Sequence, residues 1–376
     1  MSTVPDPSSR VPFYTGQVVY IYSFDIAYEL PRQPEGTLLG QPIAQVSVGS
    51  SKRSPRQLVF YRPNMITLPP QERIGPNGPV TVERAVKLLS VGAISITVRV
   101  PFRVSHIDQL VEYHDLRFAD GSLTEEVRKL AEEVRRELAP YCVRPVDQIG
   151  EEEAYTVFCI TSPLVTETGT RLSAETWLED RRRQVASILT QEKDFSLLSD
   201  QEVKENTSRC CSYYGHDLTV VDWDAALIVN DSPDIEETLY IMELANVQLT
   251  ELEAYDRILD EAVMRSYRDL ERAPLGRRRP MLASLREMRI DLARLSDELS
   301  NITKFFGDWH LARIYQMLSE RFHLGDWHRV VAGKLNTLDS LYNLHKQDQT
   351  NRWMLVLEAA IVLLFVLDLV VLFMGT

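Results

Sequence analysis

The chain has 376 residues, 44% of them hydrophobic and 25% charged, and this composition is typical of a globular protein. It excludes a collagen-like, a mucin-like or a wholly disordered polymer. The 41 basic and 54 acidic residues give a net charge of -13, so we expect no general nucleic-acid-binding surface, although a local basic patch is compatible with this balance. Only 16 glycines are present, which leaves little sequence for the glycine-rich loops that bind nucleotide phosphates.

Residues 1–13 are expected to form a disordered lead-in, because they show neither the apolar core of a secretory signal nor the arginine-rich pattern of a transit peptide. The cysteines have neither the number nor the spacing of a disulfide scaffold, and this favours a reducing compartment. They are Cys142, Cys159, Cys210 and Cys211.

Residues 14–231 are predicted to form an α+β domain with a mixed, largely antiparallel sheet and helices. Strand-like segments occupy 17–28, 42–48, 57–61, 94–102, 155–160 and 218–229, and helical spacing occurs at 107–116, 123–138 and 174–189. Within 94–102, apolar residues alternate with Ser95, Thr97 and Arg99, which predicts a half-buried strand. The segment 75–79 has the glycine and proline content of a turn. Because strands and helices do not alternate strictly, an α+β fold is favoured over a doubly wound one.

Residues 232–352 are predicted to form a helical hairpin or stalk domain. A Ser-Pro-Asp start at 232–234 opens a helix that continues to about residue 271, and a second helix covers 281–306. Apolar residues recur at spacings of three and four in both helices, which favours an antiparallel hairpin with its seams in contact. This pairing would place Asp256 within reach of Arg294. Core helices of a globular bundle are an equally good interpretation.

The tetrapeptide Gly-Asp-Trp-His occurs at 307–310 and again at 325–328. A repeated Trp-His pair is compatible with a metal or aromatic binding site, but each copy lies where one helical pattern ends and another begins. Helix capping is therefore favoured, with the glycine ending one helix and Asp308 or Asp326 accepting hydrogen bonds at the start of the next.

Residues 353–373 are apolar except for Glu358 and Asp368. A helix of this length is about 31 Å long, the thickness of a hydrocarbon core, so we expect a C-terminal transmembrane helix. A buried core helix is the alternative. The expected protein is then a tail-anchored, single-pass membrane protein in contact with membrane lipid, with its N-terminal region cytoplasmic.

Two acidic residues in such a helix need an explanation beyond anchoring, because a buried carboxylate is costly there. Glu358 and Asp368 are ten residues apart and therefore about 80° apart around a helix. We interpret them as an intramembrane helix interface, either within a homo-oligomer or with the span of a partner. The alternative is that both side chains extend to the interfaces.

Motifs for catalysis or cofactors are absent from the sequence: there is no G-x-S-x-G, P-loop, H-E-x-x-H or kinase signature. We therefore predict no catalytic, cofactor-binding or metal-binding residue. The adjacent Cys210 and Cys211, with His216 nearby, lack the spacing of a zinc site, and a structural role is favoured.

Arg277, Arg278 and Arg279 lie at the expected tip of the hairpin, with further arginines nearby. This patch predicts an electrostatic contact with an acidic partner such as a ribosome or another RNA-containing partner. A solvated loop is the alternative interpretation.

Residues 357–368 read Leu-Glu-Ala-Ala-Ile-Val-Leu-Leu-Phe-Val-Leu-Asp, and Leu311 to Tyr315 and Val331 to Leu335 precede them. These segments resemble the closing L-E-x-x-I-V-x-L-x-x-x-E and two earlier motifs of the domain-of-unknown-function 155 family, also called the required-for-meiotic-nuclear-division family. Asp368 replaces the second glutamate. The resemblance covers roughly the last 140 residues and implies no established catalytic activity. Mitochondrial members are associated with the inner membrane, self-assembly and organelle translation. Because this chain lacks a transit peptide, the resemblance implies a bacterial relative, and a bacterial inner membrane is the expected location.

Taken together, these patterns predict a non-enzymatic, tail-anchored membrane protein whose α+β domain recruits or positions a partner, as a scaffold or tether. The alternative is an enzyme or ligand-binding module of unknown chemistry in the α+β domain. A deep pocket with convergent polar groups would favour the second interpretation.

Overall fold

The computed structural model describes residues 13–31, 34, 36–45, 63–76, 78–118, 121–166, 170–230, 235–272 and 309–374. The chain divides into two compact units. Unit 1 comprises Met1–Glu253 and Ser300–Gly325, and unit 2 comprises Ala254–Leu299 and Asp326–Thr376.

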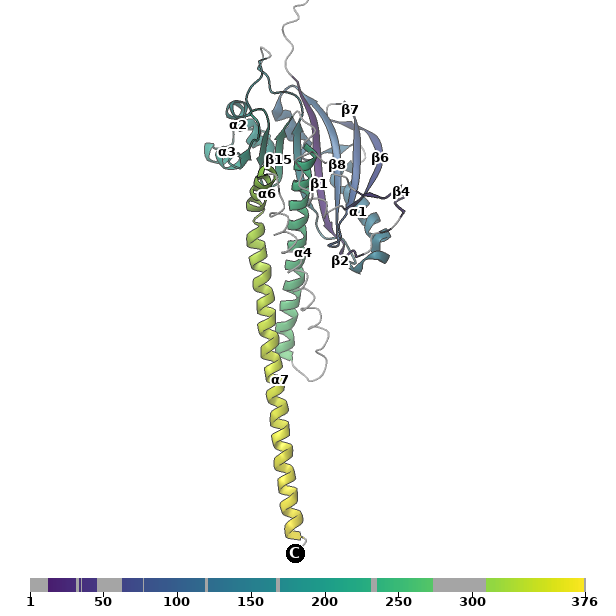
Figure 1. The fold of residues 1–376 in the computed structure, drawn as a ribbon, viewed down its shortest axis with the longest axis vertical. Helices are drawn as coiled ribbons and strands as arrows, with labels where there is room; N and C mark the ends of the chain where they lie inside the picture. Colours follow the sequence, from purple (N-terminus) through teal and green to yellow (C-terminus); the bar gives the residue numbers. More distant parts are fainter. Residues whose placement is uncertain are drawn as a thin grey trace, which may run out of the picture. The chain divides into compact units, whose positions relative to one another are not determined.

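Unit 1 is built on a nine-stranded sheet with the strand order β13-β14-β15-β12-β1-β8-β7-β6-β5 (Figure 1). Its strands are β1 (Tyr14–Asp25), β5 (Ala44–Gln45), β6 (Asn64–Gly75), β7 (Gly78–Leu88), β8 (Ala93–Val104), β12 (Glu153–Ile160), β13 (Cys210–Cys211), β14 (Leu218–Val221) and β15 (Ala225–Val229). Among these described strands, β12 and β15 pair in parallel and the other neighbours are antiparallel. The fold is therefore α+β with a large mixed sheet.

Three short strand pairs lie outside the large sheet. They are β2 (Ala27–Glu29) with β11 (Val143–Pro145), β3 (Thr37–Leu38) with β4 (Gln41–Pro42), and β9 (Arg117–Phe118) with β10 (Gly121–Ser122).

Strands β6 and β7 form a hairpin whose ends, Gly75 and Gly78, pair with each other. The turn predicted at this point is confirmed. The strands themselves escaped prediction, because charged residues such as Glu72 and Arg73 interrupt their apolar pattern. Their hydrogen bonds to neighbouring strands, rather than burial, hold these residues extended.

The main hydrophobic core lies on one face of the sheet, beneath α1 (Leu123–Leu138), α2 (Ala174–Thr190) and the 3-10 helix η2 (Ile107–Tyr113). A second 3-10 helix, η3, covers Ala139–Tyr141. Serine hydroxyls start both α-helices: Ser122 accepts a hydrogen bond from the Glu125 amide, and Ser173 accepts one from the Thr176 amide. The predicted helix at 123–138 is confirmed at both ends.

The opposite face of the sheet is covered by α4 (Ile235–Arg272) as far as Glu253 and by α6 (Trp309–Arg321). The short helix α3 (Asp200–Asn206) packs against α2. Side chains alternate between faces along a strand, so Ser95, Thr97 and Arg99 of β8 all meet α4. Ser95 is fully buried and Thr97 is 8% exposed. The predicted strand is confirmed, but its half-buried character holds only from Arg99 onward, because residues 93–98 are buried on both faces.

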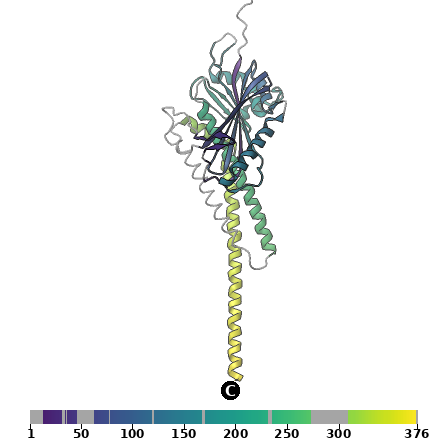
Figure 2. The same ribbon diagram turned by 90° about the vertical axis from the view of Figure 1, so that its right-hand side faces the viewer.

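Unit 2 contains α4 from Ala254 onward and α7 (Leu324–Met374) from Asp326 onward, and both ribbon views show α7 as one uninterrupted helix (Figure 1 and Figure 2). Lys334 on α7 bridges Asp256 at 2.6 Å and Asp260 at 2.7 Å. Burial by itself would lower the pKa of Lys334, but hydrogen bonds and charges from the two carboxylates raise it above its usual value. Asp326 lies in the first turn of α7 rather than at its N-cap.

The partner expected for Asp256 was Arg294, and residues 281–306 lie outside the described part of the chain. Within the described residues the cation beside Asp256 is instead Lys334. A carboxylate on an apolar seam needs a cation, and α7 supplies it. Asp308 also lies outside the described residues.

The predicted transmembrane helix is wrong. In the part of the chain that the structure describes, no helix has both the length and the apolar character that crossing a membrane requires. Residues 353–373 belong to α7, a single 51-residue helix, and Glu358 interrupts their apolar run. The predictions of a tail anchor, a single-pass topology and an inner-membrane location are corrected with it.

Candidate functional site

The predicted contact residues fall into two groups, one outside the described residues and one on α7. Arg277, Arg278 and Arg279 lie outside the described residues. Glu358 is an exposed side chain on α7, and Asp368 lies ten residues farther along the same helix.

The cysteines show no reactive arrangement. Burial raises the pKa of Cys159 and of Cys211 to about 12, which keeps both thiols protonated near neutral pH. Cys210 is exposed and lies beside Cys211 on the short strand β13. Among the described residues, no three histidine, cysteine or acidic side chains are grouped so that they could hold a metal ion.

A groove of about 450 Å³ lies between α2 and α3. It is lined by Glu179, Asp180, Arg182, Arg183, Gln184, Phe195, Asp200, Val203 and Lys204. The lining is mainly charged, and Phe195 and Val203 supply its apolar part. This combination differs from a packed core, because charged side chains on facing helices keep the space between them accessible to solvent.

Local sequence fixes the two walls of the groove. Helix α2 ends at Thr190, where Gln191 adopts a left-handed conformation with φ of 61°. Helix α3 begins after Ser199, whose hydroxyl accepts a hydrogen bond from the Glu202 amide at 3.1 Å. Between them, Asp194 accepts hydrogen bonds from the amide and hydroxyl of Ser196, which closes a compact turn.

Helix α2 is kinked beside this groove. Arg181 departs from helical geometry, with φ of -119° and ψ of 17°. Neither proline nor glycine accounts for the kink, because the helix contains neither. The next two residues, Arg182 and Arg183, both line the groove. The kink therefore lies directly before the two arginines that line the groove.

The charges of the groove are only partly used by the protein itself. Arg183 pairs with Asp200 and donates a hydrogen bond to the Leu198 carbonyl at 2.7 Å. Arg182 and Lys204 make no hydrogen bond or ion pair with any residue that the structure describes. The same holds, within those residues, for the carboxylates of Glu179 and Asp180. Two cations and two carboxylates thus remain available to a ligand.

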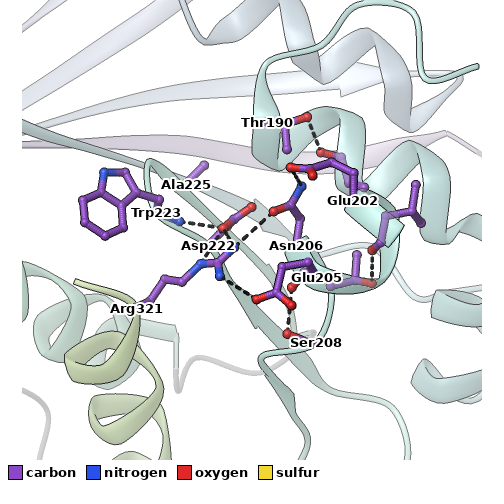
Figure 3. A network of polar contacts seen from close by, with 12 residues as sticks. Thr190, Glu202, Glu205, Asn206, Ser208, Asp222, Trp223, Ala225 and Arg321 are labelled. Atoms are coloured by element: carbon purple, nitrogen blue, oxygen red, sulfur yellow. Dashed lines mark hydrogen bonds and ion pairs between the residues drawn. The ribbon is translucent and has the colours of Figure 1, made fainter. Parts of the chain in front are cut away.

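A second polar cluster lies on the other side of α3 and centres on Arg321, the last residue of α6 (Figure 3). Its Nε donates to Asp222 Oδ1 at 2.7 Å, and its two Nη atoms donate to Glu205 at 3.2 Å and to Asn206 at 3.1 Å. Asn206 in turn donates to Glu202 at 3.0 Å. We call this set of five side chains the Arg321 cluster.

The centre of the Arg321 cluster is buried, since the side chains of Arg321 and Asp222 are 17% and 5% exposed, whereas the Glu205 side chain is 64% exposed. Burial raises the pKa of Asp222, and the hydrogen bonds and charge of Arg321 oppose that rise. Asp222 also accepts a hydrogen bond from the Trp223 amide at 2.8 Å. These contacts satisfy the guanidinium, so the cluster serves to hold α6, α3 and the β14-β15 hairpin together.

Two aromatic contacts extend this attachment beyond α6. Phe322 is buried with its ring 5.1 Å from that of Tyr155, in an edge arrangement. His323, with φ of 51°, has its ring 5.6 Å from that of Trp223. Arg321, Phe322 and His323 thus fix the end of α6 on the sheet, one residue before α7 begins.

Neither the groove nor the Arg321 cluster was anticipated from the sequence. The run of three arginines at 181–183 was a visible signal for the groove, but helical spacing alone suggested a solvated helix surface. Arg321 had no local signal, because its partners on α3 and at Asp222 are about 100 residues away or more.

Residues 15–235 match the family model described as "Uncharacterized protein MJ0711, N-terminal domain". The chain is similar to the uncharacterized protein MJ0711 of Methanocaldococcus jannaschii, with 24% identity over 220 residues. That alignment covers 58% of this chain and 65% of the relative, so the chain spans less than two thirds of its length. No solved structure matches the chain. The match includes the whole groove and stops before Arg321, and the chain belongs to the family of the MJ0711 N-terminal domain.

Proposed function

We propose that unit 1 is a ligand-binding module and that the groove between α2 and α3 is its binding site. The observation that carries this proposal is that four charged residues of the groove, Arg182 and Lys204 together with Glu179 and Asp180, pair with none of the residues that the structure describes. Charged side chains that line a groove and lack protein partners are available to pair with a bound molecule.

The proposed ligand is a small zwitterion of the amino-acid type, either a free amino acid or a short peptide. A purely anionic ligand would be attracted by Arg182 and Lys204 but repelled by Glu179 and Asp180, and a purely cationic ligand would meet the reverse. A molecule that carries a carboxylate and an ammonium group can satisfy both pairs. Phe195 offers an apolar surface to its side chain.

Binding of glycine, glutamate, lysine and glycylglycine to the purified full chain tests this proposal by ligand-observed NMR. The informative variant is Arg182→Gln with Lys204→Gln. A lost charge-assisted hydrogen bond costs about 1.5–3 kcal/mol, so the variant is expected to bind roughly tenfold more weakly or worse.

The matched control removes the same two charges elsewhere, as Lys129→Gln with Arg313→Gln. Both residues are exposed and make no hydrogen bond or ion pair with described residues. We expect the control to bind as the natural chain does. Equal weakening in both double variants would show a general charge effect, and binding of none of the four probes would contradict the proposal.

A second candidate function is self-association through α7. Large apolar side chains lie exposed along it, among them Trp353 at 58%, Leu363 at 66% and Phe365 at 70%. A continuous apolar surface of this kind is typical of an interaction site. We propose that the same helix of a second copy covers it, with Glu358 and Asp368 at the contact.

Sedimentation velocity of the purified full chain tests this second candidate. Glu358→Leu with Asp368→Leu is expected to lower the oligomer size, because it removes the polar contacts between helices. Glu133→Leu with Glu261→Leu, at two exposed positions, is the matched control. A monomeric natural chain, or an unchanged oligomer in the first variant, would contradict the role given to these two acids.

We also propose kinship with the domain-of-unknown-function 155 family. The family match and this resemblance cover different parts of the chain, 15–235 and roughly the last 140 residues. The order of a sheet domain followed by long helices supports the proposal. A contact of Arg277, Arg278 and Arg279 with an RNA-containing partner belongs to the same proposal.

A further inference from the structure

We infer that α3 couples the occupancy of the groove to the attachment of α6 at Arg321, so that ligand binding regulates the segment leading into α7. This inference rests on the ligand binding proposed for the groove. It adds a connection between two clusters that lie on either side of one short helix.

The two faces of α3 carry the two clusters. Asp200, Val203 and Lys204 line the groove. At 100° per residue, these positions lie within about 60° of Asp200 around the helix. Glu202, Glu205 and Asn206 belong to the Arg321 cluster, and they lie about 140–240° away from Asp200, which is the opposite side. A shift of α3 toward the groove therefore changes the distances of Glu205 and Asn206 from Arg321 as well.

Helix α3 is suited to move as one body. It has seven residues, so its own hydrogen bonds alone do not make it stable, and contacts on its two faces decide its position. Its C-terminal end is closed by Thr207, which donates to the Val203 carbonyl at 2.7 Å, and by Ser208, which donates to the Glu205 carbonyl at 2.7 Å. These bonds keep the two turns together when the helix shifts.

The direction of the effect follows from the charges. A zwitterion that pairs with Lys204 of α3 and with Arg182 of α2 connects the two helices. Arg183 of α2 already pairs with Asp200 of α3. With α3 held in this place, Asn206 and Glu205 remain at hydrogen-bond distance from Arg321. An occupied groove therefore stabilises the end of α6. By reciprocity, an intact Arg321 cluster raises the affinity of the groove.

Hydrogen exchange and ligand affinity of the full chain together test this coupling, with Arg321→Lys as the conservative variant and Glu205→Gln as a milder second variant at an exposed partner. Without ligand, the amides of 200–206 are expected to exchange faster in both variants, while those of α1 remain unchanged. With glycylglycine as the probe, the affinity is expected to fall about fivefold or more, although neither residue lines the groove. Arg313→Lys, on the same helix, is the matched control and should change neither quantity.

The outcomes separate this inference from the proposed function. Unchanged exchange of 200–206 and unchanged affinity in both variants would overturn the coupling and leave ligand binding intact. Failure of the natural chain to bind any probe would overturn the proposed function, and with it the regulatory part of the inference. Faster exchange throughout α1 would show general destabilisation and would also count against a specific link.

Discussion

Glu243 on α4 and Lys87 on β7 form an ion pair between helix and sheet, with side chains only 7% and 16% exposed. Ser95 donates a hydrogen bond to the other carboxylate oxygen of Glu243 at 2.6 Å. Near it, Asn246 donates to Ser23 and to the Glu153 carbonyl, both at 2.9 Å. A polar row, rather than apolar packing alone, thus sets the position of α4 along the sheet.

Lys87→Met is therefore expected to destabilise the chain by about 3 kcal/mol, because it leaves the Glu243 carboxylate buried without its cation. Lys87→Met combined with Glu243→Met should restore most of this loss, since neither charge is then buried alone. Urea unfolding followed by far-UV circular dichroism measures both effects. Arg117→Met, which removes an exposed ion pair, should change stability by less than about 1 kcal/mol. A double variant no more stable than Lys87→Met would refute this explanation.

The ion pair of Glu236 with Arg99 makes the stability of the contact between α4 and β8 depend on pH. Two hydrogen bonds of 2.6 and 2.7 Å from Arg99 lower the pKa of Glu236 below its usual 4.5. The contribution of this pair to stability is therefore present above pH 4.5 and is lost as the pH falls through the lowered pKa. Glu236→Gln should flatten the fall in the urea midpoint between neutral and acid pH. Glu133→Gln, at an exposed position, should not, and an unchanged slope in Glu236→Gln would contradict the prediction.

Gly16 is required by the close approach of β1 to β12. A Cβ atom at this position would lie 1.9 Å from the Cys159 carbonyl oxygen. Gly16→Ala is therefore expected to cost about 1–3 kcal/mol, as overpacking does in other cores. Gly333→Ala, within α7 and with open space around it, should instead stabilise its helix by roughly 1 kcal/mol. Thermal unfolding of the two variants compares them, and a neutral Gly16→Ala would show that the strands can separate freely.

The cysteines should differ sharply in reactivity. Cys210 is exposed, whereas Cys159 is fully buried with a pKa raised by burial to about 12. Maleimide labelling of the native chain near neutral pH, read by peptide mass spectrometry, is expected to modify Cys210 first. Cys159 should react only at the rate of unfolding, because the thiolate is the reactive form. Equal rates for the two thiols in the native chain would mean that the sheet opens locally at β12.

The order of elements along unit 1 could be predicted where a single period dominates. Residues 123–138 repeat with helical spacing and form α1, and residues 94–102 alternate and form most of β8. Such patterns depend on neighbours within a few residues, so the sequence reports them directly. The apolar run at 353–373 shows the limit of this reasoning: it was correctly read as helical, and its predicted transmembrane role is wrong.

The sequence by itself determined both ends of α1 and the turn between β6 and β7, because capping, periodicity and turn chemistry act over a few residues. Tertiary structure alone decided what those elements contact. In the folded chain, Glu243 of α4 covers Ser95 on the polar face of β8. Lys334 of α7 supplies the cation that pairs with Asp256. Tertiary structure also joined Arg321 to Asp222 and to α3 across roughly a hundred residues of chain. Contacts of this kind form only when the whole core is packed, and no local sequence pattern indicates which distant charged residue will pair with a buried one.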